Sequence, residues 1–134
     1  MIRNLAIVFL VLALQPIGAA AATCAGANPA ITSVVVRGVT PGPSNQYHLV
    51  GTVTNLGSSG QSKSTLQFVD IYQYGVHMDN RGIPPLAAGQ SHTFTYTWLR
   101  NPEATKGSTT LDFRIRMAQG SDCNPSNGSY HITF

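Results

Sequence analysis

The sequence predicts an all-β domain, folded as an antiparallel β-sandwich, on three observations. Residues 93–98 read Thr-Phe-Thr-Tyr-Thr-Trp, and this alternation of small polar and large aromatic residues is typical of a strand with one buried face. The same period of two recurs over residues 111–117. Turn-forming residues divide the rest of the chain into segments of strand length, and no segment after residue 23 keeps a helical period.

The first half of the domain contains three of the predicted strands. Residues 31–37 are rich in β-branched side chains, and the Pro-Gly-Pro-Ser-Asn turn at 41–45 ends this first strand. The second strand covers residues 47–54, where alternate apolar side chains share one face. A polar loop with glycines and serines follows at 55–63. The third strand, 66–74, carries apolar residues on both faces, so its faces are not assigned from the sequence.

The second half of the domain supplies the other strands. Gly75 opens a hairpin into residues 76–83, which we expect to form an edge strand. Pro84 and Pro85 end this strand because proline cannot donate a hydrogen bond to a ladder. The remaining strands are predicted at residues 91–99, 109–117 and 129–134, with loops at 101–108 and 118–128. Short strands at this regular spacing indicate an immunoglobulin-like β-sandwich of about seven strands.

Strand alternation also assigns side chains to the core and to the surface. Within residues 109–117 the apolar side chains face inward, while Asp112, Arg114 and Arg116 face outward. We expect a solvated strand face there, and a face that contacts a sugar or an anion is the alternative. Large rings supply much of the buried area of a small sandwich, so the strand aromatics are expected to form the core. These aromatic residues are Phe68, Phe94, Tyr96, Trp98, Phe113 and Tyr130.

Residues 1–22 have the features of a secretory signal peptide. Arg3 gives a positive start, residues 5–14 are apolar, and the alanines at 20–22 provide a small-residue cleavage site. The apolar run is shorter than the roughly 20 residues that a membrane-spanning helix needs, so no stable membrane insertion is expected after cleavage. The residues before Cys24 also depart from the lipid-anchor motif. We therefore expect one domain at residues 23–134, secreted or periplasmic.

The two cysteines, Cys24 and Cys123, are predicted to form a disulfide. If the strands alternate in direction as in an immunoglobulin-like sandwich, the start of the first strand and the loop at 118–128 lie at the same end. Cys24 precedes the first strand and Cys123 lies in that loop, so the topology allows the bond. A metal-binding or redox-active pair is the alternative, but these cysteines lack the short spacing of a redox pair.

Charge and composition argue against nucleic-acid binding. The chain has eight Lys and Arg residues and five Asp and Glu residues, and charged residues make up only 10% of it. The basic residues are scattered, and only Arg114 and Arg116 share a strand face. A nucleic-acid interface needs a basic stripe, which this sequence lacks.

The sequence predicts neither an enzyme nor a cofactor or metal site. The few acidic residues are not paired at a spacing that suggests acid–base catalysis, and no Gly-x-Ser-x-Gly motif is present. A blue-copper site needs a cysteine followed within a few residues by histidine and methionine, but Cys123 is followed only by the distant His131. A metal carrier therefore ranks last among the alternatives. The other histidines are His48, His77 and His92.

Four motifs resemble the CARDB family, a bacterial cell-adhesion-related domain. Val-Thr-Asn-Leu-Gly at 53–57 resembles its V-x-N-x-G strand ending, and Leu-Ala-Ala-Gly at 86–89 is similar to its entry into an aromatic strand. Residues 70–75 resemble its L-Y-x-D-G hairpin, and residues 122–129 resemble its Asn-rich segment before the final strand. The resemblance implies an immunoglobulin-like sandwich in an exported bacterial protein, usually a module that binds or spaces. This chain departs from the family by its added disulfide and its few acidic residues near the end.

We expect the function to reside in three polar loops, at residues 55–63, 84–89 and 122–128, at the same end as the disulfide. The predicted activity is non-catalytic binding of a protein or glycan partner, by a monomer or a weakly self-associating chain. The candidate binding residues are Asn55, Ser58, Ser59, Lys63, Asp122, Asn124 and Asn127. A structural or assembly subunit that pairs strands through residues 76–83 or 129–134 is the alternative.

Overall fold

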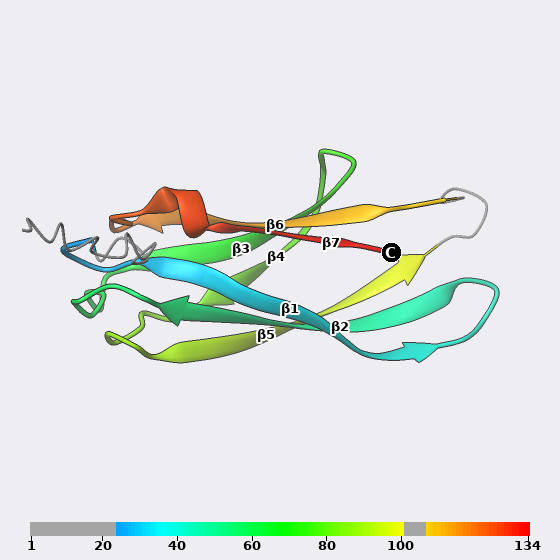
Figure 1. Ribbon diagram of the computed structural model, residues 1–134, viewed down its shortest axis with the longest axis horizontal. Coiled ribbons are helices and arrows are strands. Elements are labelled where there is room, and N and C mark those ends of the chain that lie inside the picture. Colours follow the sequence, from blue (N-terminus) through cyan, green and yellow to red (C-terminus); the bar gives the residue numbers. More distant parts are fainter. Residues whose placement is uncertain (1–23, 101–106) are drawn as a thin grey trace, which may run out of the picture.

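The computed structural model of the protein describes residues 24–100 and 107–134, which form a sandwich of two antiparallel sheets (Figure 1). The predicted signal peptide lies outside the described residues, as does most of the predicted loop 101–108. The strands are β1 (Pro29–Thr40), β2 (Asn45–Asn55), β3 (Leu66–Gln73), β4 (Val76–Ile83), β5 (Ser91–Arg100), β6 (Thr110–Gln119) and β7 (Ser129–Thr133), and η1 (Pro125–Asn127) is a short 3-10 helix. No helix in the described part of the chain is long and apolar enough to cross a membrane.

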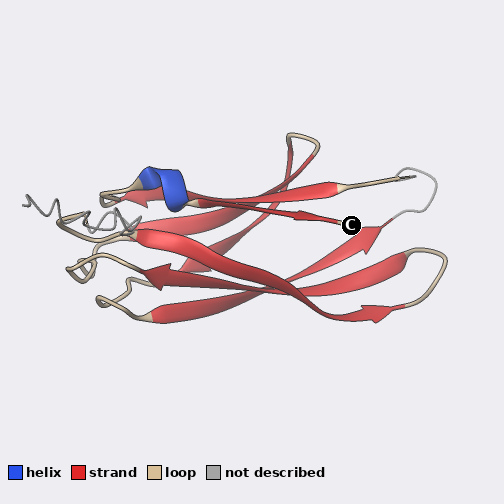
Figure 2. Cartoon of the chain, in the orientation of Figure 1, coloured by secondary structure: helices blue, strands red, loops and turns tan. Residues whose placement is uncertain are grey.

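The strand order confirms the predicted immunoglobulin-like sandwich. One sheet has the order β1-β2-β5 and the other the order β4-β3-β6-β7, and all the pairings are antiparallel. β4 lies at an edge of its sheet, as predicted for residues 76–83, and it ends before the two prolines. Loops and turns gather at the end where β1 begins (Figure 2). The predicted alternation of strand directions is therefore correct.

Most strand bounds differ from the predicted ones by one or two residues, and two further local features were not expected from the sequence. β1 is longer at both ends than predicted, because bulges between Ile31 and Ser33 and between Val36 and Gly38 let it stay paired with β2. The prediction followed the β-branched residues and stopped before Gly38, whereas the pairing with β2 continues to Thr40. The loop between β6 and β7 contains η1, whose single turn is too short to produce a helical period.

The core lies between β2 and β5 on one side and β3 and β6 on the other. Phe94, Tyr96 and Trp98 are all buried, which confirms the predicted aromatic face of β5. The Trp98 ring lies 5.4 Å from that of Tyr47 and 4.7 Å from that of Phe134, measured between ring centroids. Gly51 makes room for the Phe94 ring, since a Cβ atom there would lie 2.0 Å from Phe94 Cζ. Other buried hydrophobic residues are Ile31, Val34, Leu49, Val53, Val69, Ile71, Ile83, Leu86, Leu111 and Phe113.

The structure assigns the two faces of β3 and corrects one core prediction. Gln67, Val69 and Ile71 are buried and alternate with Phe68 and Tyr72, which are only partly buried. Phe68 is not part of the core cluster, because it faces outward beneath the guanidinium group of Arg116 on β6. The prediction that Phe68 belongs to the core was therefore wrong. An aromatic ring can be shielded from water by a neighbouring arginine as well as by the opposite sheet.

Candidate functional site

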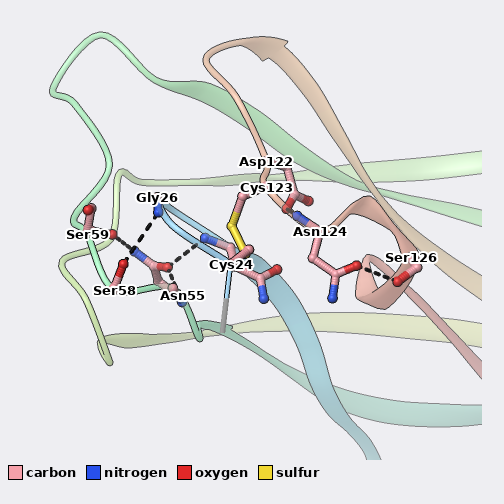
Figure 3. Close-up of a disulfide and its surroundings, with 11 residues drawn as sticks. Cys24, Gly26, Asn55, Ser58, Ser59, Asp122, Cys123, Asn124 and Ser126 are labelled. Carbon is pink, nitrogen blue, oxygen red and sulfur yellow. Dashed lines mark hydrogen bonds between the residues drawn. A yellow bond between two sulfur atoms is a disulfide. The ribbon is translucent and has the colours of Figure 1, made fainter. Parts of the chain in front are cut away.

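A disulfide between Cys24 and Cys123 ties the start of the chain's described part to the loop between β6 and β7 (Figure 3). The two Cα atoms lie 5.7 Å apart, within the range that disulfides adopt. Next to the bond, the Cys123 N–H donates to the Ala27 carbonyl over 2.9 Å. The predicted pairing of Cys24 with Cys123 is therefore present in the structure.

Three loops meet the segment before β1 at this end, which we call the loop end. It consists of residues 24–28 and the loops after β2, β4 and β6. The Leu56 N–H donates to the Asn28 carbonyl over 2.8 Å, and the Gly89 N–H donates to the Asn55 carbonyl over 2.8 Å. The backbone therefore joins the loop after β2 both to the start of the chain's described part and to the loop after β4. The predicted position of the three loops at the disulfide end is confirmed.

The side chain of Asn55 holds this arrangement together. Asn55 is fully buried, and its Oδ1 accepts from the N–H groups of Asn28 at 2.9 Å and Gly57 at 3.0 Å. Its Nδ2 donates to the carbonyls of Ser59 at 2.9 Å and Leu86 at 3.1 Å. The amide thus has two acceptor and two donor bonds, which is its full capacity. Asn55 was predicted to contact a partner, but it is a structural anchor with no polar atom left to offer.

A second set of side-chain amide bonds, which we call the Gln61–Gln67 clasp, was not predicted from the sequence. Gln61 and Gln67 exchange hydrogen bonds of 2.8 and 2.7 Å between their side-chain amides. Gln61 Oε1 also accepts from the Leu86 N–H at 2.9 Å, and Gln67 Nε2 donates to the Pro84 carbonyl at 3.1 Å. Gln67 is buried although it is polar, so it needs these partners. Gln67 is two residues from the inward-facing Val69 on the same strand, and this position could have indicated that its amide is buried and needs a partner.

Gly57 allows the chain segments to approach closely. A Cβ atom at this position would lie 2.0 Å from the Gly26 carbonyl oxygen and 2.7 Å from the Asn28 nitrogen. Both contacts are with backbone, which cannot move aside as a flexible side chain can. The Val-x-Asn-x-Gly motif at 53–57 therefore has a physical explanation at its last two named positions. Asn55 bonds the neighbouring segments, and Gly57 leaves space for them.

A pocket of about 240 Å³ lies at the loop end. Its walls come from the segment before β1, the loop after β2 and the start of the loop after β6. None of the lining residues carries a charge, so the pocket offers hydroxyl, amide and backbone groups. The lining residues are Gly26, Ala27, Ser59, Gly60, Gln61, Ser62, Thr65, Gly120 and Ser121.

The structure brings only some of the predicted binding residues to this pocket. Ser59 lines it, while Ser58 is exposed beside it and its Oγ accepts from the Gly26 N–H at 3.4 Å. Lys63 is exposed on the same loop and lies outside the lining set. Ser59 therefore stays a candidate contact by position. Ser58 and Lys63 remain candidate binding residues only because they are exposed to solvent, since neither lines the pocket.

The predicted residues of the loop after β6 are ordered by local hydrogen bonds. Asp122 Oδ1 accepts from the Asn124 N–H at 3.0 Å, and the Ser126 hydroxyl donates to Asn124 Oδ1. Burial raises the pKa of Asp122 above its ordinary value, although the Asn124 N–H opposes this shift. Asn127 is half-buried, and its Oδ1 has no hydrogen-bond partner among the described residues. These groups shape the loop beside the disulfide and do not line the pocket.

The histidines lie apart from one another on the strands. His48 Nε2 bonds the Thr40 hydroxyl at 2.8 Å, His77 Nε2 lies 3.5 Å from Asp70 Oδ1, and His131 Nδ1 contacts Asp112 Oδ1. Across residues 24–100 and 107–134, no three His, Cys, Asp or Glu side chains gather in a way that could hold a metal ion.

Comparisons with known proteins bear on the fold. No family model matches the chain, and no curated protein matches it. Among solved structures, the chain is similar to the CARDB domain of a Pyrococcus furiosus protein, determined in complex with di-metal ions. The two are 15% identical with a TM-score of 0.61, over 80% of this chain and 85% of that one. The chain therefore has a CARDB-like fold, as its four sequence motifs predicted.

Proposed function

We propose that the protein is an exported, non-catalytic module that binds a protein or glycan partner through its loop end. The observation that carries the proposal is the anchoring of the loops. The disulfide, the Asn55 amide and the Gln61–Gln67 clasp hold them around a pocket. Loops on a rigid sandwich are a common place for recognition, and loops that are ordered before binding lose less entropy on contact.

The chemistry of the pocket favours a neutral, polar group of the partner. Its hydroxyl and backbone groups can donate and accept hydrogen bonds, and no charge within the lining selects an ion. Its volume of about 240 Å³ is below the roughly 300–1,000 Å³ of typical small-molecule sites. The pocket therefore suits one sugar ring or one polar side chain of a larger partner, with the surrounding loops adding contact area.

The arrangement of the described side chains supports a non-catalytic role. The serines of the pocket have no histidine or carboxylate among the other lining residues, so no base is in place to activate them. Away from the pocket, Asp70 is bound by Arg116 and Asp112 contacts His131. These acidic groups bond to neighbouring strands in the sheet.

Pocket-filling variants test the proposal. The oxidised protein is screened against a glycan array and against immobilised exported proteins, and each partner's affinity is then measured for Ser59→Trp and Ser121→Trp. Thr93→Trp, an exposed change on β5, is the matched control. We expect both pocket variants to weaken binding at least tenfold and the control to bind normally. Equal affinity of all the variants for every partner would contradict binding at the loop end.

Strand pairing is the second candidate, and one observation favours it. β4 is an edge strand, and its first half exposes 61% of Val76 and 47% of Met78. Farther along β4, Arg81 Nε donates to the Thr95 carbonyl at 2.8 Å and so joins β4 to β5. We expect any pairing to use the first half of β4. Light scattering over a range of concentrations tests this: Val76→Lys should abolish self-association, and a wild-type protein that stays monomeric argues against the idea.

A further inference from the structure

The outer face of the four-stranded sheet carries an ordered layer that the loop-end proposal does not use. We call it the arginine face, and it consists of Phe68, Asp70 and Tyr72 on β3 with Asp112, Arg114 and Arg116 on β6. Arg114 and Arg116 alternate with buried or partly buried side chains of β6, so both project away from the core. Cross-strand pairing places Arg116 beside Phe68 and Arg114 beside Asp70.

Arg116 is fixed in place by two kinds of contact. Its Cζ lies 4.6 Å from the centroid of the Phe68 ring. Its Nε donates to Asp70 Oδ2 at 2.8 Å, and its Nη2 donates to Asp70 Oδ1 at 3.3 Å. Burial alone would raise the pKa of Asp70, but the hydrogen bond and charge of Arg116, with a contribution from His77, bring it below the ordinary value. Asp70 is therefore ionised and holds the guanidinium group along the sheet.

Arg114 is held by its ring contact, and its donors are less occupied. Its Cζ lies 4.6 Å from the centroid of the Tyr72 ring. The nearest carboxylate oxygen, Asp112 Oδ2, is 3.8 Å from its Nη2, which is beyond hydrogen-bond distance. The other oxygen of Asp112 contacts His131 Nδ1 instead. Arg114 thus presents a planar set of N–H donors that no acid of this face fully uses.

The charges of this face are layered. The side chains of Arg114 and Arg116 are 50% and 47% exposed, whereas those of Asp112 and Asp70 are 20% and 6% exposed. The carboxylates therefore lie beneath, and the cationic groups lie on top. An approaching molecule meets two guanidinium groups, whose residues are set two positions apart on one strand, so that their Cα atoms are about 6.6–6.8 Å apart along it.

We propose that the arginine face binds a polyuronate, an acidic polysaccharide whose sugars carry carboxylate groups. A planar guanidinium group matches a carboxylate with paired hydrogen bonds, so the exposed cations complement the acid groups of such a chain. β3 and β6 are both interior strands, whose backbone groups are paired on each side. No open strand edge is therefore available there for a peptide, and recognition has to use side chains on a broad face, which suits a flat, repeating, charged chain.

The proposal is tested with polygalacturonate as the probe, at low ionic strength so that surface charges are not screened. The key variant is Arg114→Gln, and Arg37→Gln is its control because it removes the same charge from an exposed site on β1, in the other sheet. We expect saturable binding that Arg114→Gln weakens at least tenfold and Arg37→Gln changes less than twofold. Arg114→Lys should recover only part of the affinity, because lysine keeps the charge and loses the planar donors.

Several outcomes would overturn this inference. Equal losses in Arg114→Gln and Arg37→Gln would mean that net charge alone attracts the polymer. Tighter binding to poly-glutamate or to dextran sulfate would assign the face to a peptide or a sulfated ligand, and no binding to polygalacturonate would reject it directly. The loop-end variant Ser59→Trp should leave polygalacturonate affinity unchanged, so the two proposals can fail separately. Circular dichroism of each variant checks that the fold is retained.

Discussion

Replacing Asn55 with alanine tests whether one side chain organises the loop end. The substitution removes all four hydrogen bonds of the buried amide and leaves the backbone groups of Asn28, Gly57, Ser59 and Leu86 to find other partners. We expect the variant to fold, because the aromatic core is untouched, but to lose stability and to loosen the loops that surround the pocket.

The loss of stability in Asn55→Ala follows from what happens to each hydrogen-bond partner of the missing amide. Asn28 is 3% exposed, so its N–H becomes a buried donor without an acceptor, which costs about 1–3 kcal/mol. The Leu86 carbonyl keeps its bond from the Gln61 N–H, and the bonds to Gly57 and Ser59 are partly buried, so water can replace some of them. Each of these three losses then costs about 0.5 kcal/mol or a little more. The expected total is about 2.5–4.5 kcal/mol.

Denaturant unfolding of the oxidised protein measures this loss as a lower midpoint at an unchanged slope. Asn80→Ala, at an exposed position on β4, is the matched control and should change stability by less than about 0.5 kcal/mol. Asn55→Asp gives a second readout. It keeps the acceptor oxygen but places a carboxylate oxygen against the carbonyls of Ser59 and Leu86. The variant carboxyl should therefore have a raised pKa in the folded state, and stability should fall as the pH rises through that value.

Two results would refute this account of Asn55. A loss below about 1 kcal/mol for Asn55→Ala would mean that water replaces the amide at little cost, and that the side chain is not an anchor. An Asn55→Asp variant as stable as the wild type at neutral pH would show that the two donor bonds to carbonyls are unimportant. In either case, the disulfide and the Gln61–Gln67 clasp would have to organise the loop end without Asn55.

Three further predictions concern the core, the disulfide and the arginine face. Gly51→Ala should lower the free energy of unfolding by about 1–3 kcal/mol, because the added Cβ overpacks against the Phe94 ring. Gly82→Ala, with no atom within 4 Å of the added Cβ, should be nearly neutral, and denaturant unfolding curves compare the two variants. Replacing Cys24 and Cys123 together with serine should lower stability by about 2–4 kcal/mol without changing the circular dichroism spectrum, since the bond spans 99 residues. Folding lowers the pKa of Asp70, so its ion pair with Arg116 stabilises the fold at pH values above the ordinary pKa of 3.8. This stabilisation is lost as the pH falls toward the lower pKa of the folded state. Asp70→Asn should therefore make the unfolding free energy less dependent on pH in the acid range.

The sequence predicted the strands and the disulfide well because both depend on strong local signals. The two-residue period around Trp98 marks a half-buried strand wherever it occurs, and the paired prolines after β4 mark the end of an edge strand. With only two cysteines in the chain, the disulfide needed just the correct strand directions. The length of β1 was missed because its run of β-branched residues stops before Gly38, while a bulge keeps the strand paired beyond that point, and a bulge is a property of strand pairing.

The candidate site was harder to predict, because its key interactions join residues far apart in the sequence. The motif at 53–57 was recognised, yet Asn55 was predicted to bind a partner. The two-residue alternation of Leu49, Gly51 and Val53 continues to Asn55 and places it on the buried face. The alternation alone therefore predicts that Asn55 is buried. Gln67 was likewise in phase with the buried Val69, but its partner Gln61 could not be predicted, because the pairing depends on a loop that folds back over the start of β3. A polar residue in phase with buried neighbours is therefore better interpreted as an anchor.

The two proposed surfaces differ in their charged residues: the loop-end pocket has none in its lining, and the arginine face exposes two guanidinium groups. Only 10% of the residues are charged, and the acids on the four-stranded sheet are committed to partners: Asp70 to Arg116, Asp79 to Arg81 and Asp112 to His131. The pocket at the loop end has no charged lining residue, so selectivity there has to come from hydrogen-bond geometry and from the fixed positions of the loops. On the arginine face the acids are covered and the guanidinium groups are exposed, so an anionic partner can make charged contacts with them at short range. Salt should therefore weaken binding at the arginine face far more than binding at the loop end.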